Sequence, residues 1–140
     1  VALGVSTGVA TLGALAAAGL ADRIGRIIPV TVALLVQVVM IWLLQGEMSF
    51  LQFMLTAAIF QTFWNLNGPY IMGTIALSDT TGRVSLLIPT AQIGGFFLGP
   101  VIAGPMLTPG AGYGPANTLA IACCLLALAI FIPVAMRLKR

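Results

Sequence analysis

Five long apolar runs constrain this 140-residue chain more than any other feature of its sequence. They occupy residues 1–20, 28–45, 49–76, 84–107 and 113–136. Each run is near or above the roughly 20 residues that a helix needs to cross about 30 Å of hydrocarbon. The runs are rich in Leu, Ala and Met and lack the alternation of barrel strands. The sequence therefore predicts an all-α, polytopic transmembrane bundle with five spans, forming one domain over residues 1–140.

The composition argues against a soluble protein, because 60% of the residues are hydrophobic and only 6% are charged. No soluble core needs that much apolar surface. The net charge of +3 comes from the connections between the runs. We interpret this charge as a topology signal, and it gives no support for nucleic-acid binding.

The basic residues alternate between the connections. They follow the first, third and fifth runs, as Arg23, Arg26, Arg83, Arg137, Lys139 and Arg140. The connections 45–49 and 108–115 carry none. Cytoplasmic connections of membrane proteins concentrate Lys and Arg. We therefore predict an external amino end and a cytoplasmic carboxyl end in a plasma membrane or bacterial inner membrane.

The first run begins at Val1, without a preceding Met or basic region. A cleaved signal would have a basic start and a short apolar core. Because the number of spans is odd, we interpret the 140 residues as the last five helices of a larger protein. The missing amino-terminal half would then be a partner within the same chain.

The third run carries the main polar cluster of the sequence. Gln61, Trp64 and Asn65 recur at helical spacing and share one face, and Pro69 follows as a helix break. The predicted substrate-binding residues are Gln61, Trp64, Asn65, Asn67, Tyr70 and, from the fourth run, Gln92. The alternative is that these polar groups only hold neighbouring helices together by hydrogen bonds.

The fourth run contains a glycine and proline pattern. Glycines clear one side of the helix, and proline weakens it. The predicted hinge and groove residues, including the break in the third run, are Pro69, Gly95, Gly99, Pro100 and Gly104. Simple close packing of helices is the alternative. Asp79, in the preceding turn, is expected to cap this helix.

The second run is bulky and apolar on nearly all sides, with Trp42 near its external end. A lipid-facing peripheral helix has this character, and we predict that position for it. The fifth run is similar. Its adjacent Cys123 and Cys124 are expected to pack as small apolar residues.

Enzymatic and metal-binding functions find little support in these residues. The chain has no His, and its three acidic residues lie at the predicted membrane boundaries. No base lies beside a candidate nucleophile, no metal-ligand pattern is present, and no nucleotide-binding loop occurs. We therefore expect no enzyme activity, no metal and no cofactor.

The connection 18–27 reads Ala-Gly-Leu-Ala-Asp-Arg-Ile-Gly-Arg-Ile. It resembles the loop of the major facilitator superfamily in which a small residue, Asp, a basic residue, Gly and another basic residue join two helices. The residues that match are Leu20, Asp22, Arg23, Gly25 and Arg26. Ala18 replaces the leading glycine, although Gly19 follows it, and Ile27 replaces a later basic residue.

In that family the loop follows the second and the eighth helices, and only the later copy leaves four helices to follow. The resemblance thus implies helices eight to twelve of a twelve-helix transporter. The segment 95–104 is similar to a glycine and proline motif that proton-coupled antiporters of this superfamily carry in their fifth helix. The eleventh helix, to which this segment would correspond, is the pseudosymmetric partner of that fifth helix.

The resemblance also implies a function. A secondary active transporter would move a small solute by alternating access, driven by a coupling ion or by the solute gradient. The loop set Gly19, Asp22, Arg23, Gly25 and Arg26 would lock the cytoplasmic face in the outward-open state. A plain positive-inside anchor is the alternative for the loop, and a non-transporting membrane scaffold or partner subunit is the alternative for the whole chain.

The predicted topology can be tested by cysteine labelling. Cysteines at Gly46 and Gly112 should react with an impermeant thiol reagent from outside, whereas a cysteine at Gly82 should not. Labelling of all three from one side of the membrane would contradict the five-span topology.

Overall fold

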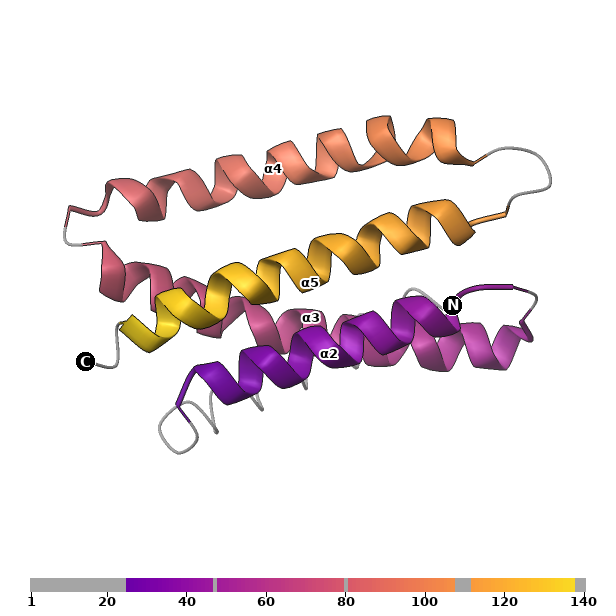
Figure 1. Cartoon of the computed structure of the whole chain (residues 1–140), viewed down its shortest axis with the longest axis horizontal. Coiled ribbons are helices and arrows are strands. Elements are labelled where there is room, and N and C mark those ends of the chain that lie inside the picture. Colours follow the sequence, from indigo (N-terminus) through magenta and orange to yellow (C-terminus); the bar gives the residue numbers. More distant parts are fainter. Residues whose placement is uncertain (1–24, 47, 80, 108–111, 138–140) are drawn as a thin grey trace.

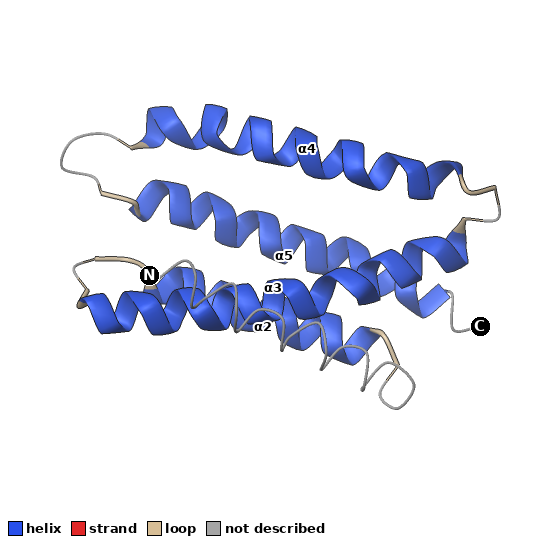
Figure 2. Ribbon diagram, turned by 180° about the vertical axis from the view of Figure 1, so that it is seen from behind, coloured by secondary structure: helices blue, strands red, loops and turns tan. Residues whose placement is uncertain are grey.

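The computed structural model describes residues 25–46, 48–79, 81–107 and 112–137. This part of the chain folds into α2 (Ile27–Leu43), α3 (Phe50–Ser78), α4 (Arg83–Ala103), the short 3-10 helix η1 (Gly104–Met106) and α5 (Gly114–Arg137). Successive helices run antiparallel (Figure 1), and Figure 2 shows only helices and connecting loops in the described ranges. The prediction of an all-α fold is confirmed. The first predicted span lies outside the described residues.

The helices differ in how well they suit a membrane. By length and composition, Arg83–Met106 and Gly114–Arg137 are apolar enough to cross one. α2 has 17 residues, or about 26 Å of rise, and is shorter. α3 is long, with 29 residues, but amide side chains interrupt its apolar sequence. Within the described residues, two helices are therefore long and apolar enough to cross a membrane, and the five predicted spans are not shown.

α2 is the most buried helix of the described part, so the prediction that it lies at the periphery was wrong. It packs between α3 and α5 (Figure 1). One stripe of α2 is buried, and it consists of Pro29, Val30, Ala33, Leu34, Gln37 and Ile41. The opposite stripe, which includes Val32, Val39 and Trp42, is exposed. A helix that is apolar on all sides suits a core as well as lipid, so its composition alone could not decide the position.

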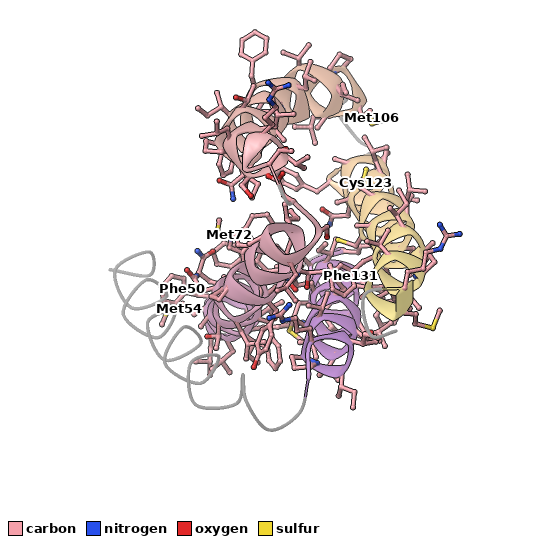
Figure 3. All side chains as sticks on the ribbon, turned by 90° about the vertical axis from the view of Figure 1, so that its left-hand side faces the viewer. Phe50, Met54, Met72, Met106, Cys123 and Phe131 are labelled. Atoms are coloured by element: carbon pink, nitrogen blue, oxygen red, sulfur yellow. The ribbon has the colours of Figure 1, made fainter. Side chains whose placement is uncertain are left out.

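The core forms where three helices meet. Val30 and Leu34 of α2 pack against Tyr70 of α3. Partly buried side chains surround this contact: Leu66, Ile71, Leu128 and Phe131. Figure 3 shows Phe131 on the side of α5 that faces α2. Three helices thus share one interior.

α4 differs from the other helices, because none of its described residues is buried. Figures 1 and 3 show α4 apart from α2, and its main packing contact is with α3, which precedes it in the chain. Large apolar side chains such as Leu86, Phe96 and Phe97 are therefore exposed. A surface of this kind suits a surrounding of lipid or of further helices.

Polar side chains satisfy the helix ends. The hydroxyl of Ser49 accepts a hydrogen bond from the backbone N–H of Gln52 at 3.2 Å and caps α3. The backbone N–H of Ser85 donates to Asp79 Oδ2 at 2.7 Å, which confirms that Asp79 caps α4. Asn117 Nδ2 donates to the carbonyl of Leu44 at 3.2 Å and joins the start of α5 to the end of α2.

The same capping contacts change the acidity of Asp79. The hydrogen bond from the backbone of Ser85, followed by weaker bonds from the Ser85 and Thr81 side chains and the Thr81 backbone, lowers the pKa of Asp79 from 3.8 to about 2. These donors favour the charged carboxylate over the protonated acid. The cap is therefore ionised throughout the neutral range.

Four connecting glycines in the described residues adopt positive φ, and three of them are the labelling positions. The values are +89° at Gly46, +71° at Gly82 and +57° at Gly112. Residues with a Cβ atom are strained in this conformation. The labelling experiment is therefore better made at their exposed neighbours Gln45, Thr81 and Tyr113 than at the glycines themselves.

The described basic residues that flank the helices lie at one end of the bundle. Arg26 precedes α2, Arg83 begins α4 and Arg137 ends α5. Because neighbouring helices are antiparallel, these three helix ends lie together (Figure 1). The end that carries the α2–α3 and α4–α5 connections has no basic residue among those described.

The inward stripe of α2 can be tested by enlarging a side chain. Ala33 is 0% exposed, so Ala33→Leu should lower the free energy of unfolding by about 1–3 kcal/mol through overpacking. Val32→Leu on the exposed stripe is the matched control and should change it little. Thermal unfolding of the purified protein in detergent measures both variants, and equal melting temperatures would contradict the central position of α2.

The cap at Asp79 predicts a pH-dependent stability. Its folded pKa is depressed, so its stabilising contribution is present above the usual value of 3.8 and is lost as the pH falls through about 2. Asp79→Ala should therefore lower the melting temperature at neutral pH, and the difference from wild type should shrink below about pH 4. Asp79→Asn keeps an acceptor without a titrating charge and serves as the control. A difference that persists unchanged at pH 2 would contradict this role.

Candidate functional site

The polar residues of α3 divide between two faces of the helix. Asn67 and Tyr70 lie on the buried face, together with Thr56 and Thr74. Gln61 and Asn65 are only half-buried, and Trp64 is 49% exposed. Each residue turns the helix by about 100°. Gln61 and Asn65 are four residues apart and therefore point in similar directions, whereas Tyr70 points to the opposite side of the helix. The predicted substrate-binding residues on α3 therefore do not form a single cluster.

The outward group is largely occupied by its own helix. Asn65 Nδ2 donates to the backbone carbonyl of Gln61 at 2.8 Å. The ring of Trp64 stacks on Phe60, with centroids 6.2 Å apart and an interplanar angle of 22°. Thr62 likewise donates to the backbone carbonyl of Ala58 at 2.8 Å. Such bonds satisfy polar groups within the helix and leave less capacity to bind a solute.

The inward group is buried, and Tyr70 of this group packs against α2. Asn67 is 6% exposed, and its Oδ1 has no hydrogen-bond partner within the described part of the chain. Tyr70 belongs to the apolar cluster with Val30 and Leu34. Buried polar atoms are normally paired, so an unpaired carbonyl at this depth is unusual.

Gln37 of α2 is a further candidate site residue, and it is not among those predicted from the sequence. Its side chain is 1% exposed, and its Nε2 has no acceptor among the described residues. The signal for it was present, because Gln37 is the only amide side chain in the middle of a bulky apolar helix. A buried polar group without a hydrogen-bond partner is costly and calls for an explanation. Because α2 was predicted to face lipid, Gln37 was not considered as a buried polar residue.

Gln92 lies apart from the other predicted substrate-binding residues. It is exposed on α4, which has no buried residue among those described. The described structure therefore does not bring Gln92 together with the amides of α3. Gln92 and the amides of α3 could share one site only if another helix packed against α4 and connected them.

The hinge and groove residues have few neighbours. A Cβ atom placed on Gly95, Gly99 or Gly104 would meet nothing within 4 Å. α3 continues through Pro69, whereas α4 ends soon after Pro100 and passes into the 3-10 helix η1. The proline after the glycine stripe thus coincides with a change of helix type. The glycine face itself is open.

The loop residues are described only in part. Gly19, Asp22 and Arg23 lie outside the described residues. Gly25 adopts φ +70°, as a residue of a tight connection does. Arg26 Nη1 donates to the backbone carbonyl of Gly73 in α3 at 3.2 Å. The partner of Arg26 is thus a backbone carbonyl within a helix.

The contact leaves room for no more than a small side chain at position 73. A Cβ atom there would lie 3.9 Å from the guanidinium carbon of Arg26, in ordinary van der Waals contact. A larger side chain would have to share this space with the guanidinium. The connection before α2 is thereby tied to the second half of α3, 47 residues later in the chain.

Comparisons with models of protein families, with curated proteins and with solved structures find no match to this chain. The resemblance to the major facilitator superfamily therefore rests on the residues of the loop and on the order of the helices. Of the loop residues, Gly25 and Arg26 lie in the described part. The chemistry available in the described site consists of amide hydrogen bonding and apolar packing.

Proposed function

We propose that this chain is the carboxyl-terminal membrane part of a secondary active transporter that moves a small solute by alternating access. The observation that carries the proposal is the distribution of polarity. Amide side chains of α2 and α3 are buried, whereas large apolar side chains cover the outside. In a protein surrounded by water, buried unpaired amides and a large exposed apolar surface would both be unfavourable.

A bilayer reverses that preference. Exposed residues such as Phe96, at 72%, contact lipid favourably, whereas polar groups at that depth are tolerated where they meet protein or a water-filled cavity. Gln37 and Asn67 satisfy this condition, because both are turned into the bundle. The proposed solute site therefore lies inside, between helices.

The proposed topology has five spans, with the amino end outside and the carboxyl end in the cytoplasm of a cell membrane. Arg26, Arg83 and Arg137 at one end of the bundle support this orientation. α2, at about 26 Å, is shorter than the hydrocarbon layer, and α3, at about 44 Å, is longer. Local thinning of the bilayer and helix tilt accommodate such differences.

The contact between Arg26 and Gly73 supports a role for the loop in alternating access. It joins the cytoplasmic connection to α3 through a charge-assisted hydrogen bond. Breaking and remaking such a bond favours one of two arrangements of the helices. The resemblance extends this role to Asp22 and Arg23, and the amino-terminal half of the same protein would complete the cavity.

The energy source follows from the charges. No acidic residue lies in the middle of a predicted span. A coupling proton or other ion would then be carried by the amino-terminal half, and transport down the gradient of the solute is the alternative.

A partner subunit of a membrane complex is the second candidate function, and the open surface of α4 favours it. No described residue of α4 is buried, and the positions beside Gly95 and Gly99 are vacant. Small residues permit close approach of a neighbouring helix. In this function the chain would assemble with other subunits without moving a solute.

Reconstitution tests the proposed transport. The protein containing this chain, in proteoliposomes, should take up members of a mixture of small neutral and amphipathic solutes, detected by mass spectrometry against empty liposomes. Arg26→Ala should lower the uptake rate several-fold, because one charge-assisted hydrogen bond is lost. Asp22→Asn should act in the same direction, with little change in membrane abundance.

Arg137→Ala is the matched control, because it removes the same charge at the same end of the bundle. It should leave the uptake rate near that of the parent protein. An equal decrease in uptake rate for Arg26→Ala and Arg137→Ala would indicate that the loop acts only as a topology anchor. Absence of uptake for every solute would favour the partner-subunit function.

A further inference from the structure

We propose that the interface between α2 and α3 contains a binding site for a neutral molecule that both donates and accepts hydrogen bonds. Gln37 provides the donor, and Asn67 provides the acceptor. The inference deepens the proposed transport function and rests on it for the nature of the solute. The site differs from the predicted set around Gln61, Trp64 and Asn65, which lies on another face of α3.

The two residues lie on the same side of the apolar core. Leu34 of α2 and Tyr70 of α3 contact the same cluster. Gln37 lies three residues after Leu34, and Asn67 lies three residues before Tyr70. Because α2 and α3 are antiparallel (Figure 1), both steps lead in the same direction along the interface. Each step advances about 4.5 Å along its helix.

Both side chains carry an atom that needs a partner. Gln37 Nε2 and Asn67 Oδ1 are buried and have no hydrogen-bond partner within the described ranges. Their residues are 1% and 6% exposed. An unpaired polar atom at this depth is costly, and a bound molecule that hydrogen-bonds to it removes the cost. One molecule with an acceptor and a donor can satisfy both amides.

The distribution of charge favours a neutral ligand. The charged residues in the described part are Arg26, Asp79, Arg83 and Arg137, and all of them lie at helix ends. Gln37 lies ten residues into α2, about 15 Å along the helix axis from its start. An ion bound there would be buried without a countercharge. Rotation of either amide exchanges donor and acceptor, and a neutral molecule with both functions still fits.

Two sources can supply this chemistry, namely water and a small neutral solute. Water bridges buried polar groups in many proteins and requires two to four polar partners. A transported solute with a hydroxyl or amide group presents the same donors and acceptors. The experiment therefore first tests whether polar molecules reach the site and then distinguishes the two sources.

Cysteine reactivity tests access to the site. In a background with Cys123→Ala and Cys124→Ala, the protein carries a single cysteine as Gln37→Cys, Ala33→Cys or Val39→Cys. Iodoacetamide, a small neutral amide, alkylates the thiolate, and intact-mass spectrometry follows the reaction. Gln37→Cys should react at least about tenfold faster than Ala33→Cys, because a thiolate forms where water is present and not in a dry core.

The controls match the position of Gln37 on α2. Ala33 lies one turn earlier on the same buried stripe and is 0% exposed. Val39 lies on the exposed stripe and reports contact with lipid or detergent. Asn67→Cys is the second variant, in case Gln37→Cys does not fold, and it should react similarly. If the correctly folded variants at positions 37 and 67 react no faster than Ala33→Cys, the proposal is overturned.

Protection distinguishes the two sources. Acetamide and urea are neutral and carry both hydrogen-bonding functions, whereas acetate and ammonium are charged. Slower alkylation of Gln37→Cys in acetamide or urea supports a solute site, and unchanged rapid alkylation supports a site for water. Protection by acetate or ammonium alone would overturn the assignment to neutral ligands. If Gln37→Cys is alkylated rapidly but the protein transports no solute in proteoliposomes, the binding site is supported and the transport function is contradicted.

Discussion

The packing of Val30 and Leu34 against Tyr70 is the contact on which the described architecture depends. It sets α2 between α3 and α5, and each of these helices presents apolar side chains to it. In a membrane the gain does not come from leaving water, because lipid is as apolar as the core. Close van der Waals fit would then provide the stability, and Val30 and Ala33, both 0% exposed, contribute to it.

The extent of the helices could be predicted from the sequence because it is a local property. The runs 28–45 and 113–136 became Ile27–Leu43 and Gly114–Arg137, within a few residues. Long apolar stretches favour helices, and the intervening glycines and short polar residues end them. The Asp79 cap was predictable for the same reason, since its partners are a few residues away. Whether each helix is long and apolar enough to cross a bilayer was harder to predict from the sequence, because α2 is short and α3 is interrupted by amides.

The position of each helix in the bundle, in contrast, depends on residues far away in the chain. α2 has apolar residues on every side, so its sequence allowed a place in lipid or in the core. The polar residues of α3 were grouped by one face, but another face is buried in the structure, and Asn65 Nδ2 donates to the backbone carbonyl of Gln61 within α3. Gln37 gained importance only because the fold buries it. These outcomes require the partners of each face, which periodicity does not identify.

The acceptor that Arg26 uses has a consequence for how the connection can respond to movement. It is a backbone carbonyl, and every residue at position 73 would supply one. The contact is therefore indifferent to the chemical identity of that residue, provided that it is small. It depends instead on the rotation and height of α3, since a shift of one residue turns the carbonyl by about 100° and raises it by about 1.5 Å. Arg26 is thus matched to a position of the helix backbone, and a rigid movement of α3 is enough to release it.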